Sequence, residues 1–246
     1  MILTRLRRGL LAGLFAGLLA GLFGFALGEP VLDRAVELEE RTHDGEHADD
    51  AVFSRGEQKA GLFLATGLYG TAVGGVFGLV SAYFRGRVSL RGEWARSLAL
   101  AGAIFAGFVL LPFLKYPPNP PGVGADPETL TARTVAYLAM TALSLLSTFF
   151  AWRLARELEG FAAPVRHLLI GAFLLFSWGL LLALMPGFGG AGDAPAELVW
   201  SFRLSSLGMQ VVLWTGLGCA FGLLGERAET RVGRAASTVV TGGEPR

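Results

Sequence analysis

The sequence predicts an all-α integral membrane protein, a polytopic bundle of about six transmembrane helices with both termini in the cytoplasm. Composition is the first indication, since 52% of the 246 residues are hydrophobic, only 17% are charged, and the mean hydropathy is +0.52. A soluble domain carries about 25% charged residues. The second indication is six apolar stretches, each close to the roughly 20 residues that cross a bilayer as a helix. The third is the position of arginine between them.

The predicted spans cover roughly residues 9–28, 60–84, 97–114, 132–152, 166–185 and 200–224. Fourteen of the 21 basic residues fall at the N-terminal end, between spans two and three, between spans four and five, and in the tail. Because cytoplasmic segments carry the excess of arginine and lysine, these four segments are assigned to the cytoplasm. We expect one transmembrane domain over residues 1–228 and a flexible cytoplasmic tail over 229–246, in the inner (cytoplasmic) membrane.

The first span carries glycine at a strict four-residue spacing, at Gly9, Gly13, Gly17 and Gly21. That spacing places the glycines in one stripe, where another helix backbone can approach closely. A basic start, an apolar stretch and the sequence at 26–28 are also compatible with a cleaved signal peptide. The apolar run is longer than a usual signal core of 7–15 residues, which favours a retained span.

Residues 29–58 form an acidic outer segment with ten Asp or Glu and three Arg. If this segment is helical, one face carries Glu29, Asp33, Glu37 and Glu40. Such a face concentrates cations near an entrance. The alternative is a solvated face that binds no ligand.

Two histidines follow, His43 and His47, among further carboxylates. Imidazole suits cobalt, nickel, copper and zinc, and carboxylates suit harder ions. The four-residue spacing binds metal well on a helix, but Gly45 favours a loop there. Metal contact and incidental surface histidines therefore both remain open.

The stretch 112–134 is polar and rich in proline between two apolar spans. Prolines 117, 118, 120 and 121 exclude helix interior and favour an extended polyproline II path. Asp126 and Pro127 then suit the N-cap and first position of the fourth span. We interpret the segment as a brace or lid at the outer mouth, with Tyr116 and Asn119 forming part of that mouth.

Ionisable groups inside membranes are costly and mark function. Arg203 lies about one turn inside span six, either as an interface anchor beside Trp200 or paired with Glu29, Glu197 or a loop carbonyl. Gln210 lies about 10 Å deeper, at 1.5 Å per residue, and either bridges helices or contacts substrate. Arg133 lies at the outer start of span four. No Asp or Glu lies at mid-membrane, so serine, threonine, methionine or backbone carbonyls would have to serve a permeating cation.

Several function classes are excluded. A net charge of +1 gives no case for nucleic-acid binding, and the single Cys219 excludes an internal disulfide. There is no Walker motif, no H-E-x-x-H and no G-x-S-x-G, so we expect neither ATP hydrolysis by this chain nor another enzyme activity.

Three stretches are distinctive as sequences: the glycine-rich first span ending in Gly28-Glu29-Pro30, LPFLKYPPNPPGVGADPETLTART at 111–134, and WSFRLSSLGMQVVLW at 200–214. Together they resemble the CbtA family of proposed cobalt transporter subunits. The resemblance extends from Leu10 to about Leu224. Members of this family often carry a histidine-rich first outer loop, here reduced to His43 and His47, and are often described with five spans, whereas charge parity here favours six.

The resemblance implies uptake of cobalt, or another divalent metal, as the transported ion and no resident cofactor. It also implies a short single-span partner, CbtB, that bears a histidine cluster. On this basis Glu29, Asp33, Glu37, His43 and His47 are expected to collect the ion outside. Arg203 and Gln210 are expected to organise span six. The alternative function is a membrane scaffold that docks partners through its glycine-lined helices without transporting anything.

Overall fold

A computed structural model describes residues 2–42, 55–88, 90–121, 123, 127–192 and 194–241. Within these residues all regular structure is helical, and six helical segments are long and apolar enough to cross a membrane. The predicted all-α fold with six candidate spans is confirmed, and the cytoplasmic position of the termini stays a prediction. The segments are Ile2–Leu38, Lys59–Phe84, Glu93–Lys115, Leu130–Glu157, Ala163–Leu184 and Ala196–Ala228. All six begin earlier than predicted, because polar residues outside the apolar stretch also form the first helical turns.

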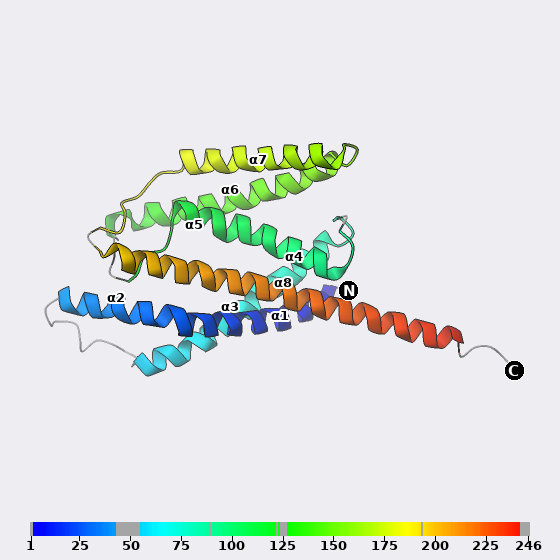
Figure 1. The fold of residues 1–246 in the computed structure, drawn as a ribbon, viewed down its shortest axis with the longest axis horizontal. Coiled ribbons are helices and arrows are strands. Elements are labelled where there is room, and N and C mark those ends of the chain that lie inside the picture. The colour runs from blue at the N-terminus through cyan, green and yellow to red at the C-terminus, as the bar shows by residue number, and fades with distance from the viewer. Residues whose placement is uncertain are drawn as a thin grey trace. The chain divides into compact units, whose positions relative to one another are not determined.

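Eight α-helices are labelled in Figure 1. They are α1 (Ile2–Phe23), α2 (Glu29–Thr42), α3 (Arg55–Phe84), α4 (Glu93–Ile104), α5 (Leu111–Lys115), α6 (Leu130–Glu157), α7 (Ala163–Leu184) and α8 (Ala196–Thr241). Two π-helical segments interrupt the first and third spans, η1 (Gly24–Gly28) and η2 (Phe105–Leu110). Pro127 opens a 3₁₀ turn, η3 (Pro127–Thr129), that leads into α6. Helix α8 continues into the segment where the sequence predicts a flexible tail.

The chain folds as two compact units. The first unit contains α1 through Leu22, α3 from Gly56, α4 through Gly102 and α8 from Val211. The second unit contains η1, α2, η2, α5, α6, α7 and α8 through Gln210.

Glycines hold α1 against α3 in the first unit. A Cβ atom at Gly13 would lie 2.8 Å from the Cα of Gly74, and one at Gly70 would lie 2.6 Å from the Cα of Gly17. Gly9 meets Gly74 and Gly78 in the same way, so the two helices run antiparallel with backbone against backbone. The predicted glycine stripe therefore packs against a second stripe, as expected for a helix of the bundle.

Glycines also allow helix α8 to lie close to α4. A Cβ atom at Gly218 would lie 2.9 Å from the Cβ of Ala101, and one at Gly222 would lie 3.1 Å from the Cα of Trp94. Ser97 Oγ donates a hydrogen bond of 2.9 Å to the carbonyl of Gly218. The rings of Phe77 and Phe221, both almost fully buried, meet edge to face at a centroid distance of 5.2 Å.

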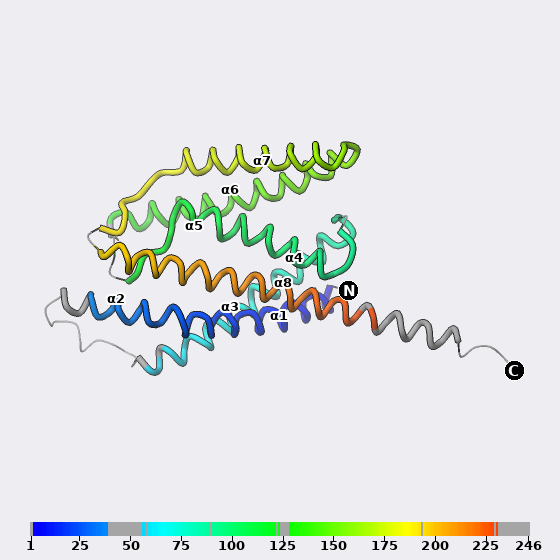
Figure 2. The backbone as a smooth tube through the Cα atoms, viewed as in Figure 1, coloured from blue at the N-terminus to red at the C-terminus, as the bar shows by residue number. Residues whose placement is uncertain are grey.

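In the second unit α6 packs against both α7 and the π segment η2. Figure 2 shows α6 and α7 lying side by side after the short connection between them. The buried face of α6 carries Met140, Thr141, Ser144 and Ser147. A polar face inside an apolar bundle is unusual, and it makes α6 the starting point for the candidate site.

Candidate functional site

A proline lies two residues after the end of each π segment, Pro30 after η1 and Pro112 after η2. At the end of η2 the N–H of Leu111 donates to the carbonyl of Ala106, five residues back. The next donor in that pattern would be residue 112, which is proline and has no N–H for the carbonyl of Gly107. Segment η1 ends in the same way, because the N–H of Glu29 donates to the carbonyl of Gly24 and Pro30 follows. Such π segments inside longer helices are frequent at functional sites.

A serine from another helix hydrogen-bonds a carbonyl of each π segment. Ser144 Oγ on α6 donates to the carbonyl of Gly107, and Ser205 Oγ on α8 donates to the carbonyl of Leu27 over 3.2 Å. Ser144 is fully buried. Inside a membrane a carbonyl without a helical partner needs such a donor, and serine hydroxyls are a common source.

The hydroxyl stripe of α6 consists of Thr141, Ser144, Ser147 and Thr148. Its hydroxyls donate to carbonyls three or four residues earlier on the same helix, with distances of 2.8–3.0 Å. Trp178 Nε1 on α7 donates to Ser147 Oγ over 2.9 Å. Met140 lies one turn before Ser144 and is fully buried. The stripe therefore offers uncharged oxygen atoms and one thioether within an otherwise apolar unit.

The proline loop, residues 116–121, and the preceding Lys115 are held by hydrogen bonds to α8 and to the C-terminal end of α7. Arg203 on α8 donates from Nε to the carbonyl of Pro118 over 3.3 Å and from Nη2 to Asn119 Oδ1 over 2.7 Å. Of the alternatives weighed for Arg203, the structure shows hydrogen bonds to the loop. The positively charged guanidinium therefore donates its hydrogen bonds to two uncharged oxygen atoms.

The other end of the loop is fastened at α7. Lys115 Nζ donates to the carbonyl of Leu182 over 2.8 Å, at the C-terminal end of α7, where a positive charge is favourable. Tyr116 donates from its hydroxyl to the carbonyl of Pro186 over 2.9 Å, and its ring packs near that of Phe188. Burial raises the pKa of the Tyr116 phenol, which favours the protonated, donating form.

The acidic face lies on α2 and is graded in exposure. Glu29 is buried at the start of the helix, Asp33 is half-buried and Glu37 is exposed. His43 and His47 lie outside the described residues. Among the side chains that the structure describes, no group of three or more His, Cys, Asp or Glu is close enough to hold a metal ion. Metal binding at this segment stays a prediction.

Two further predicted residues lie in the second unit. Arg133 is half-buried one turn into α6. Gln210 lies at the end of the α8 portion that belongs to this unit, and its Oε1 is buried without a hydrogen-bond donor among the described residues. An oxygen in this position is available as an acceptor, whereas a helix-bridging role through Oε1 is not seen.

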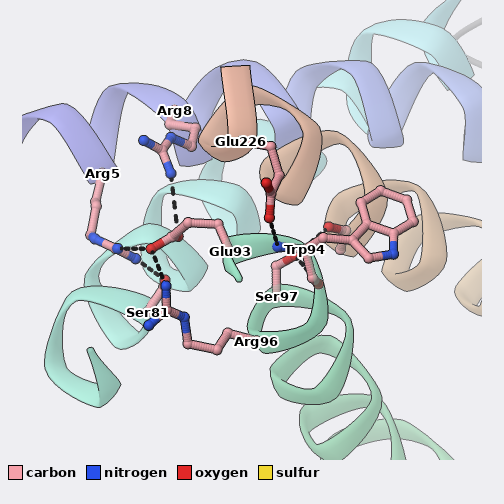
Figure 3. A network of polar contacts seen from close by, with 9 residues as sticks. Arg5, Arg8, Ser81, Glu93, Trp94, Arg96, Ser97 and Glu226 are labelled. Atoms are coloured by element: carbon pink, nitrogen blue, oxygen red, sulfur yellow. Dashed lines mark hydrogen bonds and ion pairs between the residues drawn. The ribbon is translucent and has the colours of Figure 1, made fainter. Parts of the chain in front are cut away.

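Sequence reasoning missed a buried carboxylate in the first unit. Glu93 is 3% exposed and lies among Arg5, Arg8 and Arg96 (Figure 3). The distances from their guanidinium nitrogens to its carboxylate oxygens are 2.5, 3.4 and 3.1 Å. The arginines were interpreted only as markers of the cytoplasmic side. The available indication was a glutamate beside two arginines at the start of span three, but its contact with Arg5 joins residues 88 positions apart.

The arginines make Glu93 unsuitable as a cation ligand, because its negative charge is already more than matched. Arg5 also donates to Ser81 Oγ on α3 over 2.6 Å. Glu226 on α8 accepts the N–H of Trp94 over 3.1 Å, at the first turn of α4. The cluster therefore ties α1, α3, α4 and α8 together at one end of the first unit.

Comparison with known families assigns the chain. A family model described as "Probable cobalt transporter subunit (CbtA)" matches residues 3–226. The chain belongs to the CbtA family. The match includes residues of all six candidate spans. A search of curated proteins and a search of solved structures each found no significant match.

Membership clarifies the stretches that carried the resemblance. In this CbtA chain, Glu29-Pro30 and Leu111-Pro112 end the two π segments, and the stretch at 200–214 supplies Ser205 and Arg203. These parts of the three stretches therefore coincide with the π segments of the second unit and with the side chains that hydrogen-bond there.

Proposed function

We propose that this CbtA protein is the membrane-embedded subunit of a cobalt uptake transporter. The observation that carries the proposal is the family match over residues 3–226, together with six spans in the same residues. We further propose that it acts with a small single-span, histidine-bearing partner of the CbtB type. A family of transporter subunits gives no expectation of enzyme activity.

The proposed entrance is the acidic face of α2 with the two histidines beyond it. Glu29, Asp33 and Glu37 attract a divalent cation, and His43 and His47 supply nitrogen ligands. The described carboxylates do not by themselves form a three-ligand cluster. A histidine-bearing partner would complete the ligand set, which agrees with the word "subunit" in the family description.

The proposed route past the entrance uses uncharged oxygen and sulfur atoms of the second unit. The hydroxyl stripe, the Met140 thioether and the buried Gln210 oxygen are the polar groups that support this part of the proposal. Tyr116 and Asn119 lie on a loop fastened at both ends, which suits a rigid mouth. Irregular backbone at membrane depth is typical of transporter sites.

The orientation also belongs to the proposal. Arginine-rich segments favour cytoplasmic termini and an outer position for α2 and the proline loop. Arg8 of α1 and Gly225 of α8 lie together in the first unit, so these parts of the chain share one end of that unit. The inner membrane is the expected location.

Uptake of radioactive cobalt tests the proposal. Cells grown under cobalt limitation should lose uptake when the gene is deleted and regain it with the wild-type chain. Purified protein in liposomes, with and without the candidate partner, separates the two functions considered. Metal-dependent flux supports a permease, whereas partner binding without flux supports a scaffold. Unchanged uptake after deletion would falsify the transport proposal.

A further inference from the structure

The chain passes between the two units at three points inside candidate membrane spans. It crosses at Leu22–Phe23 in the first span, at Gly102–Ala103 in the third and at Gln210–Val211 in the sixth. One residue separates the first crossing from η1, which begins at Gly24, and two separate the second crossing from η2, which begins at Phe105. The π segments therefore coincide with two places where a membrane helix joins one unit to the other.

Within each unit the helices are held together by contacts that resist bending. In the first unit the backbones at Gly13 and Gly74 are in contact, and the cluster around Glu93 ties α1 to α4. In the second unit Trp178 joins α7 to Ser147 of α6. A rotation of one unit against the other would therefore be absorbed at the crossings, as hinge motions are absorbed by a few residues between rigid parts.

The π segments are suited to absorb a bend. Proline removes a backbone donor, and sharp bends in helices occur at prolines, glycines and π segments. Ser144 donates to the carbonyl of Gly107 in η2, and Ser205 donates to the carbonyl of Leu27 in η1. Because these donors are side chains that can rotate, the bonds can follow a small movement of the backbone.

The crossing in the sixth span lies against the crossing in the first. A Cβ atom at Gly208 would lie 2.6 Å from the ring of Phe23, the residue at which the first span enters the second unit. Two residues later, Gln210 Oε1 is buried without a hydrogen-bond donor among the described residues. Spans one and six therefore change unit at adjoining residues, where a bend in one helix is accommodated beside a glycine of the other.

We propose that η1, η2 and residues 208–210 of α8 form a hinge about which the two units rotate. Ser144 and Ser205 are positioning residues that hold the two π segments in register. Rocking of one helix bundle against another is how many transporters expose a site to alternate sides of the membrane. The test of the hinge uses no metal, so its outcome is separate from that of the cobalt uptake experiment.

Distances between spin labels measure such a rotation. The chain has a single cysteine, so a Cys219→Ala background accepts labels at chosen positions. Arg85→Cys with Glu159→Cys gives a pair with one label in each unit. Glu159→Cys with Ala183→Cys lies within the second unit, and Arg85→Cys with Arg227→Cys lies within the first. All four labelled positions are exposed.

Double electron–electron resonance is recorded on the full chain in phosphatidylcholine nanodiscs. Helix α6 ends at Glu157, 13 residues beyond Ser144. At 1.5 Å per residue this is about 20 Å, so a bend of about 10° moves a label there by about 3–4 Å. The wild type should therefore give a distance distribution between the units that is broader by about this amount than both distributions within a unit.

Two pairs of substitutions should change that distribution in opposite directions. Ser144→Ala with Ser205→Ala should broaden it, because the π segments lose their side-chain donors. Pro30→Ala with Pro112→Ala should narrow it, because each π segment regains a backbone N–H. Ser177→Ala, which removes a hydroxyl bonded within α7, should leave it unchanged.

The wild-type measurement decides the proposal even where a variant fails to fold. A between-unit distribution as narrow as those within the units overturns the hinge. The hinge is also overturned if the serine substitutions broaden all three distributions equally, which would indicate a general loss of packing, or if the proline substitutions leave the between-unit distribution as broad as before.

Discussion

The two units of this protein hold their helices together by different means. In the first unit, glycines such as Gly13 and Gly74 bring backbones into direct contact, and a buried ion cluster around Glu93 joins the helices at one end. In the second unit, serine hydroxyls reach the carbonyls of two π segments. Close packing and interhelical hydrogen bonds are the two devices available to helices in lipid, where water gives no hydrophobic drive between them.

Buried and half-buried arginines also have different partners in the two units. Arg5 in the first unit is paired with a carboxylate, whereas Arg203 in the second unit rests on the uncharged oxygens of Pro118 and Asn119. In the first unit, Arg5 and the carboxylate it contacts therefore have a structural role. The second unit also contains the hydroxyl stripe of α6 and the buried Gln210 oxygen, which is why we propose the transport route there.

The largest effect is expected from Glu93→Gln. Three guanidinium groups would lose their shared carboxylate, and breaking a buried ion pair costs about 3–5 kcal/mol. The free energy of unfolding in mixed micelles of SDS measures this change. Glu157→Gln, in an exposed pair with Arg153, should cost only about 0–1 kcal/mol. Equal effects of the two substitutions would contradict the structural role of the cluster.

The second-largest loss of stability is expected from Gly74→Ala. Its Cβ would lie 2.6 Å from the Cα of Gly13, a backbone atom that cannot turn away as a side chain does. Over-packing of this kind costs about 1–3 kcal/mol and sometimes more. Thermal unfolding in detergent should show a fall of about 2–12 °C, taking 2–4 °C for each kcal/mol. Gly171→Ala on α7, where nothing lies within 4 Å, should leave the unfolding temperature unchanged.

Ser144→Ala tests the hydrogen bond on which η2 depends. A buried carbonyl left without a donor costs about 1–3 kcal/mol, and the loss should appear in the unfolding free energy. Pro112→Ala restores a backbone N–H five residues after Gly107, so the double variant should recover part of the stability. Ser177→Ala serves as the control, since the Ser177 hydroxyl donates to the carbonyl of Leu174 on its own helix. Failure of the second substitution to rescue the first would show that η2 does not depend on Pro112.

The smallest effect is expected at the proline loop. Arg203→Lys removes the fork that contacts two acceptors at once, and Asn119→Ala removes one of those acceptors. A coupling of about 1.5–3 kcal/mol is the upper range for a charged hydrogen bond, and partial exposure should bring it near the lower end or below. A double-mutant cycle on unfolding, with hydrogen exchange of residues 116–121, measures the coupling. Additive effects would mean that the loop is fixed by Lys115 and Tyr116 instead.

The sequence was sufficient for the spans and for the role of the first glycine stripe. Hydropathy and length identify helices in lipid because the backbone has no other way to satisfy its hydrogen bonds there. The pairing of Gly13 with Gly74 was not predicted, because a stripe indicates close approach without naming its partner. The starts of the spans were also predicted too late, since first-turn residues such as Glu93 are charged.

The candidate site was less accessible to prediction. The π segment before Pro112 was not predicted, and the hydroxyl that bonds its Gly107 carbonyl comes from Ser144, 37 residues later. Glu93 looked like an ordinary charge at a helix start, and only its distant arginines reveal its burial. The metal-binding roles of Glu29, Asp33 and Glu37 remain predictions, as do those of the two histidines beyond the described part of α2.

The bond between Ser144 and Gly107 also constrains how the protein is made. The third span leaves the ribosome before the fourth, so the carbonyl of Gly107 reaches the membrane before its donor has been synthesised. Until α6 arrives, that carbonyl needs another donor, either water or a backbone N–H of its own span. We therefore expect the third and fourth spans to enter the bilayer together, as a helical hairpin, and not one after the other.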